Sequence, residues 1–484
     1  MHFRIVARFI ALLTLFIGSS MALPLSVSFF YDDGSAHALL LSMLATAITG
    51  LVLFFSVKKR EDTHLNHRDG VAIVTLGWIM AGLLGTLPFI LSGAIPNFTN
   101  AFFESVSGFT TTGASVVSDI EALPKGILLW RSLTQWLGGM GIILLSIAIL
   151  PFLGVGGMQL YKAEVPSPVV DKLKPRISET AKTLWKVYVL ITITQIVLLI
   201  AGGMSVFDSI CHAFCTMPTG GFSTKNASVA HFNSVYFDSV IIIFMILAGI
   251  NFSLHYKFLR GGAKVFSSDV ECRVFLAIVG IFILIVTLNI YGTATAYESI
   301  TRAFRDAAFQ VSSIITTTGF VTADYEKWPA LSQLVLLICM FLGAMAGSTG
   351  GGIKIMRVML LFKHGYQQLF KIIHPHAVTT VKLGGKPVPQ DILNSIWGFF
   401  ILYIGLFVVA TLIMASLGLD IISAFSSVAA CIGNIGPGLG IVGPLRNYLE
   451  IPIIGKWVLI FCMLLGRLEI YTVILLLTPE YWRK

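Results

Sequence analysis

Ten apolar segments recur along the chain, and they restrict its fold more than any other feature of the sequence. A transmembrane helix needs about 20 mostly apolar residues. Segments of that kind cover residues 9–30, 37–57, 71–94, 127–152, 184–203, 236–256, 272–291, 331–346, 392–416 and 453–477. Only 12% of the 484 residues are charged, against roughly 25% in an ordinary soluble domain, so polar side chains are too few to cover a soluble surface. The sequence therefore predicts an all-α polytopic membrane protein.

Lysine and arginine gather in alternate connecting segments. Of the 33 basic residues, 24 lie in the N-terminal residues, in 58–68, 162–186, 257–273 and 354–386, and in the last two residues. Because cytoplasmic loops carry an excess of Lys and Arg, we expect these segments and both termini in the cytoplasm. The net charge of +9 is then mainly an orientation signal. A nucleic-acid partner is not expected, because it would need a basic face on a soluble domain.

A short amphipathic stretch followed by a Gly/Thr-rich turn occurs four times, each time between two apolar spans. The turns are residues 107–115, 216–223, 315–320 and 433–438. Aligning Gly113, Gly220, Gly319 and Gly436 gives a repeat of 99 to 117 residues. The predicted organisation is a two-helix N-terminal region, 1–69, followed by four pseudo-repeats of helix, re-entrant loop and helix at 70–157, 158–260, 261–375 and 376–484.

The stretches that precede the turns are too short to cross a bilayer. Residues 100–108, 206–216, 297–315 and 419–433 allow about two to five helical turns each. We expect re-entrant half-helices that enter the membrane, stop midway and return through the turn. Irregular backbone persists at that depth only where protein buries it or where it lines a wet cavity. Four such turns in one chain most simply face a common axis, a central pore.

The composition of the turns favours a site for a dehydrated monovalent cation. Glycine adopts left-handed backbone conformations that aim carbonyls inward, and threonine adds a hydroxyl oxygen. A ring of carbonyls replaces the hydration shell of a cation, and the C-terminal ends of the half-helices add partial negative charge. The turns contain no carboxylate, which a divalent-cation site would use, so potassium is the first candidate. The candidate potassium-binding residues of this selectivity filter are Thr111, Thr112, Gly113, Thr219, Gly220, Thr317, Thr318, Gly319, Asn434, Ile435 and Gly436.

In these turns the sequence resembles the Trk/Ktr/HKT superfamily of cation transporters, and within it the Trk-type potassium uptake subunits of bacteria, TrkH and TrkG. The resemblance covers essentially the whole chain. It rests on the four turns and on three further motifs, residues 130–141, 346–354 and 466–469. In that family the pore unit is a pseudo-tetramer like a potassium channel, and two extra helices precede it in Trk members.

The resemblance also implies cofactors, partners and location. Family members are homodimers in the bacterial cytoplasmic (inner) membrane, and they associate with a cytoplasmic regulatory subunit that binds the nucleotide, ATP/ADP or NAD. This chain would bind only the potassium ion and no covalent cofactor. Glycine in all four turns goes with potassium permeation in the superfamily. Pro218, Asn434, Ile435 and Pro437 break the fourfold symmetry, and the second Tyr-Gly of potassium channels is missing, so we infer looser discrimination against sodium.

A glycine cluster interrupts the apolar stretch of the third repeat and is the first gate candidate. It consists of Gly347, Ser348, Thr349, Gly350, Gly351 and Gly352. Glycine destabilises a helix by roughly 1 kcal/mol relative to alanine, so a break is expected. A phosphate-binding loop is excluded because Ile353 separates the glycines from Lys354 and no strand precedes them. A close helix contact through small residues stays open; the resemblance implies a loop below the filter that blocks the pore until it moves.

Arg467 is the second gate candidate, because it lies inside the last apolar span. An ionisable residue there costs at least ~2.5 kcal/mol on insertion scales unless it is paired or hydrated. A structural ion pair with Glu469, or with a helix end, is one interpretation. The preferred hypothesis is that Arg467 lies below the filter and raises an electrostatic barrier to cations.

Two other classes of function compete with a passive, gated potassium path. A secondary transporter by symport would couple potassium to protons or sodium; the turns offer no titratable group, but backbone oxygens can also build coupling sites, so this alternative stays open. A membrane-embedded enzyme is disfavoured, because no carboxylate pair or His/Asp cluster recurs at one membrane depth. Cys211 and His212 lack a third ligand nearby for a metal. Basic stretches such as 354–386 fit the regulatory partner and anionic membrane lipid equally well.

Overall fold

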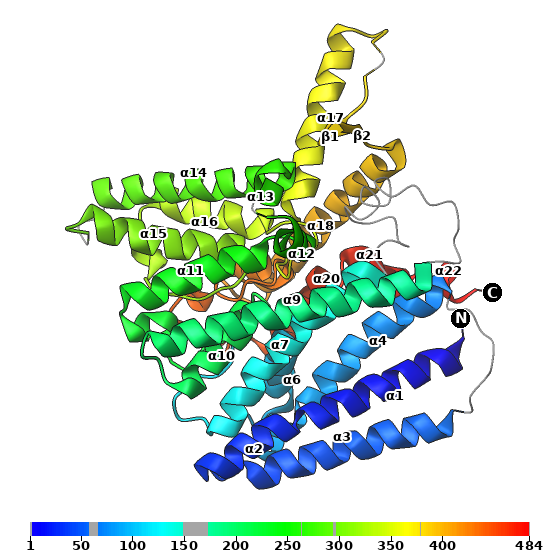
Figure 1. The fold of residues 1–484 in the computed structure, drawn as a ribbon, viewed down its shortest axis with the longest axis vertical. Helices are drawn as coiled ribbons and strands as arrows, with labels where there is room; N and C mark the ends of the chain where they lie inside the picture. The colour runs from blue at the N-terminus through cyan, green and yellow to red at the C-terminus, as the bar shows by residue number, and fades with distance from the viewer. Residues whose placement is uncertain are drawn as a thin grey trace.

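The structure is a computed structural model that describes residues 2–57, 66–148, 173–262, 264–293, 297–377 and 379–483. Helices make up nearly all of its regular structure, and a two-stranded antiparallel ribbon, β1 (Lys382–Leu383) with β2 (Lys386–Pro387), joins two of them (Figure 1). The predicted boundary between residues 157 and 158 lies outside the described residues. The predicted all-α membrane fold is confirmed.

Most of the predicted spans are helices of membrane-crossing length. Six of these are long and apolar enough within the described residues, and two bent helix pairs also pass if each is taken as one span. The six are α1 (Phe3–Ser20) with α2 (Ala22–Tyr31), α3 (Ala36–Ser56), α4 (His67–Gly85) with α5 (Leu87–Leu91), α9 (Leu173–Ala201), α14 (Val270–Thr293) and α18 (Gln390–Ser416). The span expected at 127–152 corresponds to α7 (Lys125–Ala148).

Three spans that hydropathy presents as continuous are broken. The chain bends by 101° between α11 (Val235–Gly249) and α12 (Phe252–Gly261), and by 117° between α20 (Ile453–Arg467) and α21 (Ile470–Leu477). α16 (Ala330–Leu342) ends before the glycine cluster, and α17 (Ile355–Ile373) begins after it. The spans predicted at 236–256 and 453–477 therefore each consist of two helices joined at a sharp bend. Each of these two breaks depends on a single residue within an apolar stretch, so hydropathy does not show it. Asn251 caps the start of α12, and Glu469, just before α21, has a positive φ of 62°.

Four short helices occupy the predicted half-helix positions. They are α6 (Phe98–Phe109), α10 (Val206–Thr216), α15 (Ile300–Ile315) and α19 (Ile421–Ile432). Each begins at a residue whose side-chain oxygen accepts a backbone N–H of the first turn; these residues are Asn97, Ser205, Ser299 and Asp420. Such caps satisfy donors that the helix itself leaves unpaired. The half-helices predicted from the sequence are thus present.

Each half-helix packs between the two spans of its own repeat and also against the preceding repeat. α6 packs between α4 and α7, α10 between α9 and α11, α15 between α14 and α16, and α19 between α18 and α20. The second contact joins α10 to α7, α15 to α11, α19 to α16 and α6 to α20. Because the last of these contacts returns to the first repeat, the four repeats form a closed ring.

The N-terminal helices lie outside this ring, with α1 packed on α3 and α4. Both chain ends meet the start of α4 at one end of the molecule (Figure 1). His2 Nδ1 lies 2.8 Å from Asp69 Oδ2, and Arg68 Nη1 donates to the Arg483 carbonyl at 2.6 Å. The two termini therefore lie on the same side of the protein.

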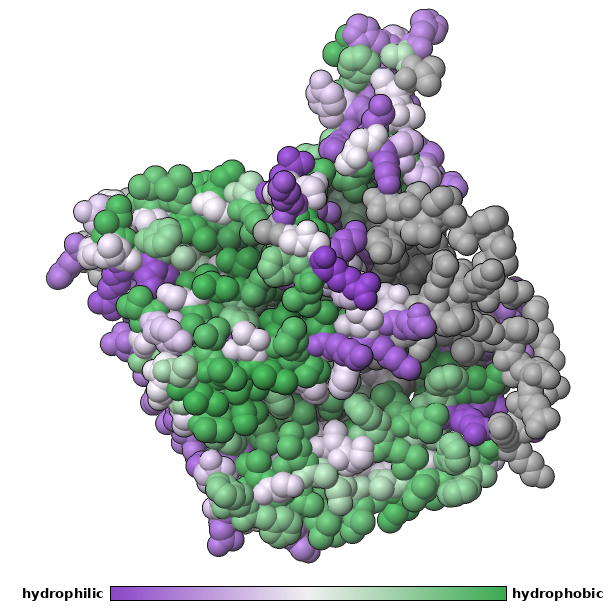
Figure 2. Space-filling model, in the orientation of Figure 1, coloured by the Kyte–Doolittle hydropathy of each residue, from purple (hydrophilic) through white to green (hydrophobic). Residues whose placement is uncertain are grey.

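The remaining elements are short, and one long helix projects from the body. The short ones are η3 (Ser228–Phe232), η4 (Tyr325–Lys327), η5 (Gly440–Val442), α13 (Lys264–Ser268) and α22 (Pro479–Trp482). α17 and the adjoining ribbon extend beyond the bundle (Figure 1), and polar side chains are frequent at their tip, whereas the visible face of the body is largely apolar (Figure 2).

Candidate functional site

The four turns share one backbone conformation. Two residues in each have a positive φ, the first a non-glycine at 54° to 61° and the second a glycine at 75° to 100°. The non-glycine positions are Thr111, Thr219, Thr317 and Asn434, and the glycines are Gly113, Gly221, Gly319 and Gly436. A positive φ is uncommon for a non-glycine residue, so its recurrence at four equivalent places indicates a conformation that the surrounding protein imposes.

Short hydrogen bonds tie each turn to its own half-helix. The residue between the two positive-φ positions donates its N–H to the carbonyl five residues earlier, at 2.8 Å in every turn. The donors are Thr112, Gly220, Thr318 and Ile435, and the acceptors are Ser107, Cys215, Ser313 and Ala430. Each turn is therefore a fixed extension of the helix that precedes it.

The structure corrects the sequence alignment of the second turn by one residue. Gly221, and not Gly220, has the backbone of Gly113, while Gly220 is equivalent to Thr112. Two adjacent glycines made the choice ambiguous. The phenylalanine that follows Gly221, like the one that follows Gly319, is the signal that identifies the correct register.

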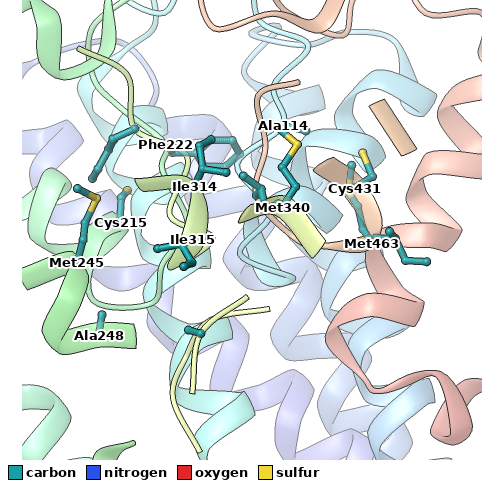
Figure 3. Packing of buried hydrophobic residues seen from close by; sticks show 14 of the residues in the cluster. Ala114, Cys215, Phe222, Met245, Ala248, Ile314, Ile315, Met340, Cys431 and Met463 are labelled. Carbon is teal, nitrogen blue, oxygen red and sulfur yellow. The ribbon is translucent and has the colours of Figure 1, made fainter. Parts of the chain in front are cut away.

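The turns lie against one another in a ring. A Cβ on Gly113 would overlap the Gly220 carbonyl oxygen, one on Gly221 the Thr318 oxygen, and one on Gly319 the Ile435 oxygen. A Cβ on Gly436 would lie 2.8 Å from the Thr112 oxygen, which closes the ring at the first turn. Buried apolar side chains from all four repeats surround this region, among them Ala114, Phe222, Ile315, Met340 and Met463 (Figure 3). Only glycine fits at these four positions.

A buried polar side chain from each half-helix forms a hydrogen bond with the irregular segment that follows its turn. Glu104 Oε2 accepts the Val116 N–H at 2.9 Å, and Ser426 Oγ accepts the Leu439 N–H at 2.9 Å. His212 Nε2 lies 3.0 Å from Ser223 Oγ. His212 thus braces the second turn, and among the described residues no group of three or more His, Cys, Asp or Glu is arranged to hold a metal ion.

In the third repeat the equivalent side chain is Gln310. Its amide oxygen accepts the Thr322 N–H at 2.7 Å in the orientation that satisfies both the oxygen and the nitrogen of the amide. Glu104, which holds the first turn, is also part of a buried ion pair. Arg131 Nη2 lies 2.8 Å from Glu104 Oε1, and Arg131 Nη1 donates to the Ser223 carbonyl at 3.2 Å. This pair joins the first turn to the second.

The glycine cluster forms a loop that lies directly against three of the turns. Gly351 N donates to Thr317 Oγ1 at 2.7 Å, and Thr349 Oγ1 donates to the Met217 carbonyl at 2.9 Å. A Cβ on Gly351 would overlap the Gly433 carbonyl oxygen. The small residues therefore allow close backbone packing, which was one interpretation of the glycine cluster. They also interrupt the helix, which was the other interpretation.

Side chains from distant elements hold the loop in place. Glu271 Oε1, on α14, accepts the N–H groups of Ala346 at 2.8 Å and Met356 at 3.2 Å. Lys354 Nζ donates to the Gly350 carbonyl. The sequence motifs did not single out Glu271, and no local signal marks it, because these contacts are with residues at least 75 positions away.

Arg467 is buried and points at the same loop. Its Nη1 donates to the Thr349 carbonyl at 2.7 Å, and its Nη2 donates to the Gly138 carbonyl of α7 at 3.3 Å. Glu469 pairs instead with Arg357, with Nη2 and Oε2 2.7 Å apart. The structure thus places the two gate candidates in contact, and the alternative Arg467–Glu469 pair is not among the ion pairs of the described residues.

Comparisons with known proteins agree with this architecture. The sequence model of the TrkH family, described as cation transport protein, matches residues 36–484. The chain is 44% identical over 488 residues to the Trk system potassium uptake protein TrkH of Escherichia coli (strain K12), with all of both chains covered. It is 36% identical over 487 residues to TrkG of the same organism, covering 100% of this chain and 99% of TrkG.

A solved structure gives the same result. The crystal structure of the potassium transporter TrkH from Vibrio parahaemolyticus matches with a TM-score of 0.91 and 40% sequence identity, and all of both chains is covered. These relatives are transporters, so the enzyme alternative is rejected. The chain belongs to the TrkH family of cation transport proteins.

Proposed function

We propose that this protein takes up potassium across the cytoplasmic membrane through the ring formed by its four turns. The observation that carries the proposal is the repeated contact between the glycine of one turn and a carbonyl of the next, because it brings four equivalent backbone segments around one axis. The curated relatives are named potassium uptake proteins. The proposed ion ligands are oxygens of residues 111–113, 219–220, 317–319 and 434–436.

The chemistry of this ring suits a large monovalent cation. Its residues carry hydroxyl, amide and carbonyl oxygens and no carboxylate. Such neutral oxygens replace the hydration shell of potassium without the net charge that a divalent cation requires. The half-helices end at the turns, so their C-terminal partial charges add to the attraction.

The glycine loop and Arg467 form the proposed gate. The loop contacts the second, third and fourth turns, and Arg467 joins it to α7 of the first repeat. A cation leaving the ring toward this side would meet both the loop backbone and a buried positive charge. Conduction therefore requires the loop to leave its place, which breaks its bonds to Glu271, Thr317 and Arg467.

Reversal potentials in proteoliposomes test the proposal. With a potassium gradient alone, the passive path predicts the potassium equilibrium potential, and an opposing proton or sodium gradient leaves it unchanged. A shift that follows the proton or sodium gradient with fixed stoichiometry would establish the coupled transporter instead. Gly113→Ser is expected to lower potassium flux and the preference for potassium, because its side chain meets the Gly220 carbonyl.

We further propose that the protein acts as a homodimer with a cytoplasmic, nucleotide-binding regulatory subunit. One face of α17 exposes Phe362, Tyr366, Leu369 and Ile373 at a helical spacing, each more than 60% exposed. The helix projects from the body and carries lysine and glutamine between these residues, which favours a protein partner, a second copy of this chain, over lipid. Leu369→Asp is expected to yield monomers in size-exclusion chromatography with light scattering, whereas Lys363→Asp is the matched control.

The regulatory partner is tested separately. Potassium flux should change with ATP, ADP or NADH only when a Trk-type nucleotide-binding subunit is present. Regulation by nucleotide of this chain alone would contradict the proposal.

A further inference from the structure

The second turn lacks the side-chain support that the first and third turns have. In the first turn the Thr110 and Thr112 hydroxyls lie 2.8 Å apart, and in the third turn Thr316 and Thr318 repeat this pair at 2.8 Å. The equivalent residues of the second turn are Pro218 and Gly220. Because the turns follow one another around the ring, the two turns with hydroxyl pairs face each other, and the second turn must be held in another way.

Gln135, on α7 of the first repeat, holds the second turn. Its Nε2 donates to the Gly220 carbonyl at 2.7 Å, and its Oε1 accepts the Phe222 N–H at 3.1 Å. The side chain is fully buried. A Cβ on Gly220 would overlap the Gln135 amide, so the glycine at this position and the glutamine on α7 require each other.

This contact makes one carbonyl of the ring different from its equivalents. In the described part of the chain, the carbonyls of Thr112, Thr318 and Ile435 accept no side-chain hydrogen bond, whereas that of Gly220 does. A donor on a carbonyl oxygen draws electron density from it and restrains its direction. Among the four equivalent carbonyls, that of Gly220 is therefore both weakened and fixed.

We propose that Gln135 is a positioning residue that sets the discrimination between potassium and sodium, an inference that rests on the proposed conduction through this ring. Sodium is smaller, so it gains more from carbonyls that move inward and from a stronger ligand field. The Gly220 carbonyl, which Gln135 holds in place and whose electron density it reduces, can neither move inward nor strengthen the ligand field. Loss of this hydrogen bond should therefore favour sodium, whether cavity size or field strength determines selectivity.

The test uses two variants and one matched control in the full-length protein. Gln135→Met keeps the length of the side chain but offers neither a donor to the Gly220 carbonyl nor an amide oxygen to the Phe222 N–H. Gln135→Leu removes both hydrogen bonds. Gln195→Leu is the control, because this buried glutamine donates at 2.9 Å to a hydroxyl, Thr216 Oγ1 in the last residue of α10, and not to a carbonyl of the ring. The sodium-to-potassium permeability ratio is measured from reversal potentials, together with rubidium uptake.

We expect the permeability ratio to rise about fivefold in both Gln135 variants, since one hydrogen bond contributes about 1 kcal/mol. Gln195→Leu should leave the ratio unchanged. A fall in rubidium uptake with an unchanged ratio would show a structural role only and would overturn the inference. Absence of potassium flux in the unmodified protein would instead overturn the proposed function, so the two failures are distinguishable.

A compensating double variant gives a second, independent readout. Gln135→Ala with Gly220→Thr removes the amide and restores to the second turn the Thr-Thr-Gly sequence of the first and third turns. It should have a ratio closer to the unmodified protein than Gly220→Thr alone, whose side chain collides with Gln135. A double variant that is no better than that single variant would contradict the reciprocal dependence of the two positions.

Discussion

The ring of turns and the loop against it are both buried and rich in glycine, yet they are held in different ways. Each turn is bonded at 2.8 Å to its own half-helix, through atoms five residues apart. The loop is held from other elements, by the side chains of Glu271, Thr317 and Arg467 and by backbone bonds such as that from the Phe252 N–H to the Gly347 carbonyl. Local backbone bonds cannot be lost without unfolding the turn, whereas long-range bonds to other elements can be exchanged as a unit. The origin of its hydrogen bonds, and not its glycine content, therefore decides whether such a segment is fixed or can move.

The largest effect is expected from breaking the support of the ring. Glu104→Leu leaves Arg131 buried without its partner, which costs about 3–5 kcal/mol. Thermal unfolding in detergent should show a large loss of stability. The double variant Glu104→Leu with Arg131→Met should recover most of it, because no buried charge remains. A loss below about 1 kcal/mol in the single variant would mean that the turns are not braced as described.

The next effect is expected from releasing the loop at Arg467. Arg467→Ala removes two bonds from a charged donor, each contributing about 1.5–3 kcal/mol. Rubidium flux without a regulatory partner should rise at least about tenfold, since 1.4 kcal/mol corresponds to a factor of ten. Arg467→Lys keeps the charge and should have a smaller effect. Unchanged flux in folded, membrane-inserted protein would remove Arg467 from the gate.

Displacing the loop sterically should have an intermediate effect. Gly351→Ala places a Cβ against the Gly433 carbonyl, so the loop must shift away from the fourth turn and flux should rise several-fold. Gly365→Ala is the matched control, because nothing lies within 4 Å of its added Cβ, and it should leave flux unchanged. A flux in Gly351→Ala equal to that of the control would show that the loop is not seated tightly enough to block conduction.

The smallest effect is expected at Glu271. Glu271→Gln keeps an oxygen that can accept from Ala346 and Met356 but replaces the other carboxyl oxygen with an amide N–H₂ group, which weakens the anchor by about 0.5 kcal/mol. Flux should rise about twofold, and the permeability ratio should stay constant because the ring is untouched. A change in the permeability ratio would show that the loop anchor also affects the ring, and would contradict the separation of a fixed ring from a movable loop.

Local chemistry explains which parts of this fold the sequence predicts. The half-helices and turns are marked by short apolar stretches and Gly/Thr clusters that act within a few residues, and their positions are confirmed. The breaks after α11 and α20 were missed because hydropathy continues across them. The partners of Gln135 and Glu271 lie 75 or more positions away, and a single sequence carries no signal for such contacts.

The closed packing of the repeats also fixes when the ring can be completed during synthesis. Asn434 Nδ2 donates to Thr112 Oγ1, a hydroxyl made 322 residues earlier, and α6 packs against α20 in the last tenth of the chain. During synthesis, the first half-helix therefore lacks its contacts with the fourth repeat until nearly the whole protein has been inserted into the membrane. Truncation before α20 would leave α6 packed on α4 and α7 but without its partner from the fourth repeat, so such products should be unstable and removed by membrane proteases.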